Sequence, residues 1–325
     1  MTKKKTSVRI AEFAFVLSAI ALTATGVKFL MDNYDEMPLY AGDGLSSVSD
    51  SSNSAGDLLS QIAEEKDDGF TDIDVDNSTL GMGDLILVNK DHAFTSWDKI
   101  ELLNIFEYEN KSDSYSLKDR NVVACKVFVD ALNTMLSEFY GVSGIDDIML
   151  KSAYRTYEHQ QELYGDGAEG NLVAPPGNSE HHTGLAVDFS LFKGSYMEDF
   201  TGEGEYAWIM NNCHKYGLIN RYTVEKRDIT KYDAETWHFR YVGVPHSYIM
   251  KEKNMCLEEY IEFIKGFSNL EPCSFDVSDT EKYIIYYVAA DASATSTKVP
   301  VPDDITDYTV SGNNVDGFIV TVKMP

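Results

Sequence analysis

Two short segments concentrate the side-chain types that hold metal ions in enzymes. They are residues 179–188, SEHHTGLAVD, and residues 235–241, ETWHFRY. Two histidines and one carboxylate are a common ligand set of catalytic zinc, because three protein ligands leave the fourth position for a water whose pKa then falls to about 7. His181, Asp188 and His238 supply such a set for one zinc ion.

A hydrolytic site of this kind also needs a group that takes a proton from the water and returns it to the leaving amine. Glu235 suits this role of general base. Residues three apart share a side on a helical turn but not on a straight strand, so we expect a turn that ends at about Thr236, before His238. The chain contains no His-Glu-x-x-His sequence, and it is therefore not an ordinary zincin.

The residues on either side of the proposed ligands alternate as in strands. A strand is expected at residues 185–190, and the face of Asp188 has the small neighbours Gly184 and Ala186, whereas the opposite face is bulky and suits a core. We expect the small face to leave room for a metal and a peptide. A second strand is expected at residues 237–242, where His238 points to the same side as Arg240.

The elements that must position these strands follow from hydrophobic spacing. Apolar residues recur every three or four positions from Cys125 to Phe139, which is typical of an amphipathic helix against a core. Further strands are expected at 85–88 and 148–153, further helices at 158–164, 206–216 and 257–267, and β-rich runs at 283–288 and 317–322. This alternation indicates an α+β fold, and the last two runs predict a small C-terminal β appendage.

With these motifs in place, the chain resembles the bacterial D-alanyl-D-alanine carboxypeptidases of the M15 type, near VanY, whose signature is Ser-x-His-x-x-Gly-x-Ala-x-Asp followed by Glu-x-x-His. Every fixed position is matched, and the resemblance covers about residues 80–267. It implies a small antiparallel sheet with flanking helices, zinc on His181, Asp188 and His238, and the base role for Glu235.

The resemblance also implies roles for three further residues. It places Arg155 near the carbonyl oxygen, where its fixed donors would stabilise the oxyanion. It makes Ser179 and Gln160 substrate-contacting positions. His182 stands where the family usually has a glutamine, directly beside His181, but a strand-edge neighbour points the other way, and His181 is the predicted ligand.

The amino terminus has the order of a membrane-inserted segment. Four basic residues between Lys3 and Arg9 precede fifteen charge-free residues, 13–27, and this order sends the rest of the chain outward. Fifteen residues span about 22 Å, short of a hydrocarbon core of about 30 Å unless Lys28 snorkels and residues 29–31 continue the span. A cleaved signal peptide and an uncleaved anchor are both open. The anchor is favoured because no small-x-small cleavage site closes the run.

The expected organisation has five parts: a basic cytoplasmic tail at 1–9, a transmembrane signal anchor at 10–31, a flexible acidic linker rich in Ser, Gly and Asn at 32–79, a zinc peptidase domain at 80–267, and the β appendage at 268–325. The protein is then a single-pass protein of the cell membrane with an extracytoplasmic catalytic domain, or a secreted one if the segment is cleaved.

Three alternating aspartates at the end of the linker, Asp72, Asp74 and Asp76, resemble part of a calcium-binding loop. They lack the glycine and final glutamate of an EF-hand loop, and we interpret them as solvated linker.

Charge and cysteine usage exclude other classes of protein. A formal net charge of −26 would repel phosphate backbones, so a nucleic-acid partner is not expected. The four cysteines have no Cys-x-x-Cys spacing, which indicates neither a zinc ribbon nor a redox pair. Four unpaired thiols are favoured over a bond between Cys256 and Cys273.

The resemblance, together with the ligand and base motifs, implies a metallocarboxypeptidase that removes the C-terminal D-alanine from peptidoglycan stem peptides or their lipid-linked precursors, with Glu235 activating a zinc-bound water. Dipeptidases acting on free D-Ala-D-Ala share the ligand and base motifs, so the choice of carboxypeptidase rests on the anchor and tether. L,D-carboxypeptidase activity on tetrapeptide stems stays open. A non-catalytic, zinc-containing wall-binding module is the alternative of another class, and the retained Glu235 favours catalysis over it.

Overall fold

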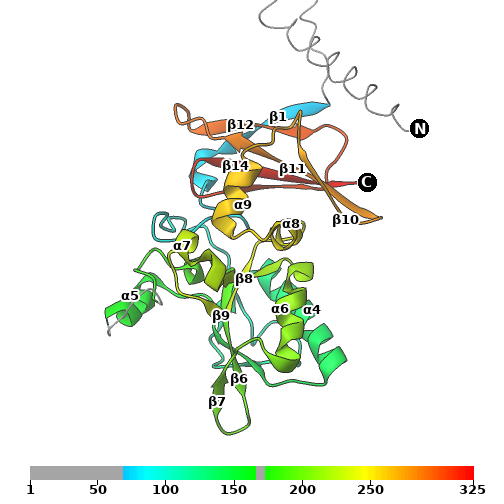
Figure 1. The fold of residues 1–325 in the computed structure, drawn as a ribbon. Coiled ribbons are helices and arrows are strands. Elements are labelled where there is room, and N and C mark those ends of the chain that lie inside the picture. Colours follow the sequence, from blue (N-terminus) through cyan, green and yellow to red (C-terminus); the bar gives the residue numbers. More distant parts are fainter. Residues whose placement is uncertain (1–68, 166–172) are drawn as a thin grey trace, which may run out of the picture. The chain divides into compact units, whose positions relative to one another are not determined.

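The computed structural model describes residues 69–165 and 173–325 (Figure 1). The expected membrane segment and the linker up to residue 68 lie outside the described residues. Within the described part of the chain, no helix combines the length and the apolar character that crossing a membrane requires.

A mixed sheet carries the two motif segments. Its strands follow the order β3-β5-β6-β9-β8, with β7 added beside β6, and all neighbours are antiparallel except β3 and β5. The strands are β3 (Ser116–Leu117), β5 (Ile148–Ser152), β6 (Ala186–Phe192), β7 (Met197–Asp199), β8 (Leu218–Tyr222) and β9 (Glu235–Tyr241). The α+β prediction is confirmed, with one parallel pair at an edge of the sheet.

Helices cover this sheet and close the core. They are α4 (Lys126–Ser143), α5 (Tyr157–Gly165), α6 (Ala207–Asn212), α7 (Arg227–Thr230), α8 (His246–Lys253) and α9 (Leu257–Ile264), with the short 3-10 helices η2 (Asn77–Thr79), η3 (Glu180–Thr183), η4 (Gly204–Tyr206), η5 (Cys213–Tyr216) and η6 (Val224–Lys226). A two-residue pair, β2 (Leu103–Asn104) and β4 (Val123–Ala124), precedes α4. The helix expected at 206–216 is divided into η4, α6 and η5.

The main core lies between α4 and one face of the sheet. Phe128 and Leu132 of α4 share a buried cluster with Val187 and Phe189 of β6 and with Phe239 of β9. The bulky face predicted for the strand of Asp188 therefore does pack into the core. Figure 1 shows β6, β9 and β8 as neighbours, with α4 and α6 close together along the same part of the molecule.

The C-terminal residues form the expected β structure. Four antiparallel strands follow the order β10-β11-β14-β13, and β12 pairs with a strand from the start of the described chain, β1. Their bounds are β1 (Phe70–Asp76), β10 (Cys273–Ser278), β11 (Glu281–Ala289), β12 (Ser296–Pro302), β13 (Tyr308–Gly312) and β14 (Gly317–Met324). Figure 1 shows β1, in cyan, beside the orange β12.

The linker prediction is wrong for residues 70–79. Residues 70–76 are strand β1, in which Ile73 and Val75 pack toward a buried cluster. The acidic side chains point outward, and Asp74 pairs with Lys298 of β12 at 2.7 Å. The alternating aspartates thus lie on the exposed face of an edge strand. The period of two indicates a strand, but the polar composition of the segment favoured a linker.

The prediction of a strand at residues 85–88 is also wrong, although these residues are buried as an apolar run predicts. Leu85 and Val88 are almost fully buried, but the backbone there has no regular strand partner. Its amides bond to other groups instead, Leu85 N–H to Ser311 Oγ at 3.0 Å and Leu87 N–H to the Asn313 carbonyl at 3.0 Å. An apolar run predicts burial, but it does not identify the hydrogen-bond partner.

A second core joins the peptidase elements to the C-terminal strands. Ile249 of α8 and Ile261 of α9 are buried together with Ile285 of β11 and Ile319 of β14.

All four cysteines are unpaired in the structure, including Cys256 and Cys273, which agrees with the favoured prediction.

Candidate active site

The two motif segments meet because their strands are neighbours in the sheet. Strands β6 and β9 pair antiparallel in a register that sets Asp188 directly opposite His238. Side chains opposite each other on one face of such a pair lie about 4.5–5.5 Å apart at their Cβ atoms. Sheet register alone therefore brings two of the three predicted ligands together.

His181 reaches the same place through the turn before β6. It lies in the 3-10 helix η3, which ends at Gly184 with a left-handed φ of 68°. A Cβ at Gly184 would meet Leu102 at 2.7 Å and Cys125 at 3.0 Å, so the glycine is needed both for the turn and for close packing. This corrects our interpretation of Gly184, whose small size serves packing behind the site.

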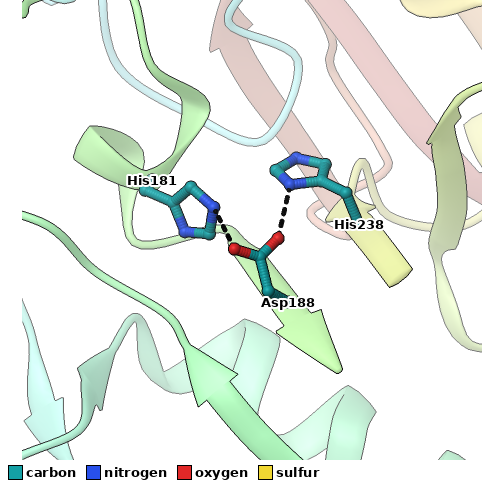
Figure 2. A group of neighbouring side chains, drawn as sticks. All are labelled: His181, Asp188 and His238. Carbon is teal, nitrogen blue, oxygen red and sulfur yellow. Dashed lines mark hydrogen bonds and ion pairs between the residues drawn. The ribbon is translucent and has the colours of Figure 1, made fainter. Parts of the chain in front are cut away.

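The three side chains converge with the spacing that one metal ion requires. His181 Nε2 lies 3.2 Å from Asp188 Oδ2, and His238 Nδ1 lies 2.9 Å from Asp188 Oδ1 (Figure 2). The three ligand atoms all lie within 4.8 Å of one another. Two ligands held tetrahedrally by zinc at about 2.0–2.2 Å are about 3.4 Å apart, so the donor set fits one such ion with small adjustments.

Hydrogen bonds on the far side of each imidazole leave the other ring nitrogen free to bind a metal ion. His181 Nδ1 lies 2.6 Å from the Ala153 carbonyl, which can only accept, so Nδ1 carries the proton and Nε2 faces Asp188. His238 Nε2 lies 3.4 Å from Glu180 Oε2, while its Nδ1 faces Asp188. Backing acceptors of this kind are typical of metal-binding histidines, because they fix the tautomer.

The local charges also favour a cation between these side chains. Burial by itself would lower the pKa of His238, but hydrogen bonds to Asp188 and Glu180 outweigh it and raise the pKa to about 9. Burial likewise opposes ionisation of Asp188, yet His181 and His238 hold its pKa well below the usual range. The residues present therefore suit a bound metal ion.

Glu235 lies in the same cavity but not on the turn that we expected. Strand β9 already begins at Glu235, and an irregularity of the bulge type sets its residues 235–239 opposite only three residues of β8, Asn220 to Tyr222. The irregularity brings Glu235 Oε2 to 3.8 Å from His238 Nδ1. Burial raises the pKa of Glu235 to about 7, a value suited to a group that both accepts and returns a proton near neutral pH.

Arg155 lines the cavity, and contacts with three neighbouring side chains fix the position of its guanidinium group. Its Nη1 donates to Gln160 Oε1 at 2.7 Å, and its Nη2 donates to Ser152 Oγ at 2.9 Å and approaches Asp188 Oδ2 at 3.5 Å. Its buried Nε–H has no hydrogen-bond partner among the described residues. A guanidinium fixed by these contacts at the wall of the cavity is suited to stabilise a developing negative charge.

The two predicted substrate contacts differ in their positions. Ser179 is buried and lines the cavity. Gln160 is fully buried, and both ends of its amide are engaged, one with Arg155 and the other as a donor to the Ala174 carbonyl at 2.7 Å. The structure thus places Gln160 behind Arg155, and direct contact of Gln160 with substrate stays a prediction.

His182 is excluded as a ligand by its own contacts. Its Nδ1 lies 2.7 Å from the Arg155 carbonyl, and its Nε2 accepts from the Gly177 amide at 3.1 Å. Its ring also packs 4.6 Å from that of Trp97. The choice of His181 over His182 agrees with the metal-binding group that the structure forms.

Sequence reasoning missed the groups that surround the site. Glu180, Arg221 and Arg240 form a buried ion network behind His238, and Tyr222, Tyr232 and Trp237 line the cavity. Glu180 could have been noticed as a charged residue inside the motif segment next to His181. Arg221 carries no such local signal, because only the tertiary fold brings β8 to this position.

Three converging ligands, an adjacent carboxylate and a fixed arginine on a mixed α+β sheet define a single-metal hydrolase site. Comparison with known proteins gives the family. Residues 126–244 match the family model described as VanY, D-alanyl-D-alanine carboxypeptidase. A D-alanyl-D-alanine carboxypeptidase of Enterococcus faecium is 36% identical over 243 residues, which cover 74% of this chain and 75% of that protein.

Two further similarities agree with this result. The bifunctional D-Ala-D-Ala dipeptidase and D-Ala-D-Ala carboxypeptidase VanXYC of Enterococcus gallinarum is 37% identical over 132 residues, covering 36% of this chain and 68% of that protein. The crystal structure of the vancomycin resistance D,D-dipeptidase VanXYg, in complex with a D-Ala-D-Ala phosphinate analog, has a TM-score of 0.68 at 30% identity, covering 78% of this chain and 99% of that one. The chain belongs to the VanY family of metallo D-Ala-D-Ala carboxypeptidases.

Proposed function

We propose that this protein is a zinc carboxypeptidase that removes the C-terminal D-alanine from peptidoglycan stem peptides. The observation that carries the proposal is the convergence of His181, Asp188 and His238 within 4.8 Å, with Glu235 only 3.8 Å from His238. Family membership supports the same reaction. A wall-binding module without activity would have no need for Glu235 and Arg155 in this arrangement.

Each side chain has a role in hydrolysis of the terminal amide. Zinc bound by the three ligands would act as a Lewis acid and lower the pKa of the attacking water. Glu235 takes a proton from that water as it adds to the carbonyl carbon, and returns a proton to the nitrogen of the departing D-alanine as the C–N bond breaks. Arg155 donates to the carbonyl oxygen as negative charge develops on it.

The cavity suits a peptide that ends in small residues. Its volume is about 240 Å³, and Leu163, Val173 and Ala174 form an apolar part beside the ligands. VanXYg, which this chain resembles over 78% of its length with a TM-score of 0.68, was crystallised with a phosphinate analogue of D-Ala-D-Ala. Both observations support a D-alanyl-D-alanine terminus as the group that binds.

We also propose that the peptidase part acts outside the cytoplasm, held at the membrane by residues 10–31. The support is the order of basic residues followed by a charge-free run. The test is fractionation of cells that produce the full chain, with alkaline carbonate extraction and protease digestion of intact protoplasts. Release by carbonate, or protection of the peptidase part from protease, would contradict the proposal.

Mass spectrometry of stem peptides tests the reaction itself. The full chain, loaded with zinc, is incubated with pentapeptide stems, tetrapeptide stems and free D-Ala-D-Ala, with Glu235→Gln as the matched control. We expect loss of one D-alanine from the pentapeptide with the native chain alone. Trimming of the tetrapeptide alone would make the enzyme an L,D-carboxypeptidase, and cleavage of the free dipeptide alone would make it a dipeptidase.

A further inference from the structure

Behind His238 lies a buried ion network that the reaction itself does not use. The side chain of Glu180, in η3, is completely buried, as are those of Arg221 in β8 and Arg240 in β9. Glu180 Oε1 accepts from Arg221 Nε at 2.8 Å and from Arg240 Nη1 at 3.0 Å. Its other oxygen, Oε2, lies 3.4 Å from His238 Nε2.

This geometry assigns different tasks to the two oxygens of Glu180. Both arginine donors point at Oε1, so Oε2 is left as the acceptor that faces His238. An acceptor at Nε2 keeps the imidazole proton on that nitrogen and leaves the lone pair of Nδ1 turned toward Asp188. Nδ1 is the nitrogen that lies 2.9 Å from Asp188 Oδ1.

The two arginines are fixed independently of Glu180. Arg240 Nη2 donates to the carbonyls of Asp84 and Ile86 at 3.0 and 2.9 Å. Arg221 forms a two-pronged pair with Glu258, from Nη1 to Oε2 at 2.9 Å and from Nη2 to Oε1 at 2.7 Å. Such a fork restricts the guanidinium in both position and orientation.

Glu258 extends the network to the second core. It lies in the first turn of α9, and that helix packs with β11 and β14 through Ile261, Ile285 and Ile319. Two carboxylates and two guanidinium groups make the network neutral overall, which lets it persist in a dry interior. A continuous series of hydrogen bonds therefore connects His238, a proposed metal ligand, with α9, the helix that packs against the C-terminal strands.

We propose that Glu180 is a positioning residue that holds His238 with Nδ1 toward the metal, and that Glu258 supports Glu180 through Arg221. The inference rests on the proposed zinc site. It follows that the packing of α9 affects how His238 is oriented for the metal, although neither Glu180 nor Glu258 touches the scissile amide.

Glu180→Gln tests the arrangement without changing the size of the side chain. The arginine donors would hold the amide oxygen at the Oε1 position, so the NH₂ group would face the Nε2–H of His238, donor against donor. The zinc dissociation constant of the full chain, measured by competition with a chelator and without substrate, is expected to rise about 10–100-fold. Glu258→Gln is expected to raise it by a smaller factor, and Glu262→Gln, on α9 but outside the network, is expected to leave it unchanged.

A second measurement separates positioning from general stability. In the zinc-loaded native chain, the Nε2 proton of His238 should give a downfield NMR signal that exchanges slowly with water. This signal should move upfield and exchange faster in Glu180→Gln and stay in place in Glu262→Gln.

A folded Glu180→Gln chain with native zinc affinity and an unmoved signal would overturn the inference. If Glu180→Gln does not fold, Glu258→Gln alone decides: weaker zinc binding supports the inference and native binding overturns it. Failure of the native chain to trim stem peptides while it binds zinc would overturn the proposed function and leave the positioning role intact.

Discussion

Glu235 and His238 lie three residues apart on one strand, yet Glu235 Oε2 is only 3.8 Å from His238 Nδ1. On a regular strand, residues at this spacing point to opposite faces. The bulge in β9 opposite Tyr222 and Asn220 removes that restriction. A local break in the ladder thus places a proton acceptor beside a metal ligand, in keeping with the frequent occurrence of bulges next to active sites.

Replacement of Arg155 by lysine should reduce kcat much more than zinc affinity. Lysine keeps the charge but cannot reproduce the fork that donates to Gln160 and Ser152. We expect kcat for D-alanine release to fall about 10²–10³-fold, the usual effect of losing an oxyanion donor. Equal kcat values for Arg155→Lys and the native chain would show that Arg155 is structural.

Mutation should distinguish the roles of the adjacent residues His181 and His182. His181→Ala removes a ligand, so zinc affinity should fall by more than the 10–100-fold typical of groups behind a ligand. His182→Gln should keep native zinc affinity and lower the free energy of unfolding by about 1–3 kcal/mol, because two buried hydrogen bonds are disturbed. Competition with a chelator and denaturant unfolding measure the two effects. Weaker zinc binding in His182→Gln than in His181→Ala would reverse the ligand assignment.

His246 should make the fold sensitive to mild acid. It bridges Tyr260 of α9 and Thr321 of β14, and burial lowers its pKa to about 3. Since the unfolded chain takes up the proton below pH 6.5 and the folded chain does not, stability falls as the pH drops below 6.5. The loss is about 1.4 kcal/mol per pH unit, or about 2 kcal/mol at pH 5.

Denaturant unfolding of the native chain and of His246→Gln at pH 7.5 and pH 5 checks this prediction. The glutamine chain should lose less stability between the two pH values, whatever its stability at pH 7.5. Identical losses in the two chains would show that His246 does not contribute to acid sensitivity.

The site was largely predictable from sequence because its ligands lie in two compact segments. Alternation around Asp188 predicted strand β6 and its buried face, and helical spacing predicted α4. The positions that failed depend on partners far along the chain. Residues 70–76 become a strand only by pairing with β12, and the bulge at Glu235 depends on β8. Arg221 joins the site through Glu180 and Glu258, contacts that no local pattern specifies.

The most direct test of the central claim follows D-alanine release from a pentapeptide stem as zinc is removed and restored. We predict that the chelated native chain is inactive and that one equivalent of zinc restores activity. Glu235→Gln should bind one equivalent with little activity, about 10²–10⁴-fold below the native chain. Release of D-alanine by the metal-free chain, or native activity in Glu235→Gln, would contradict the account.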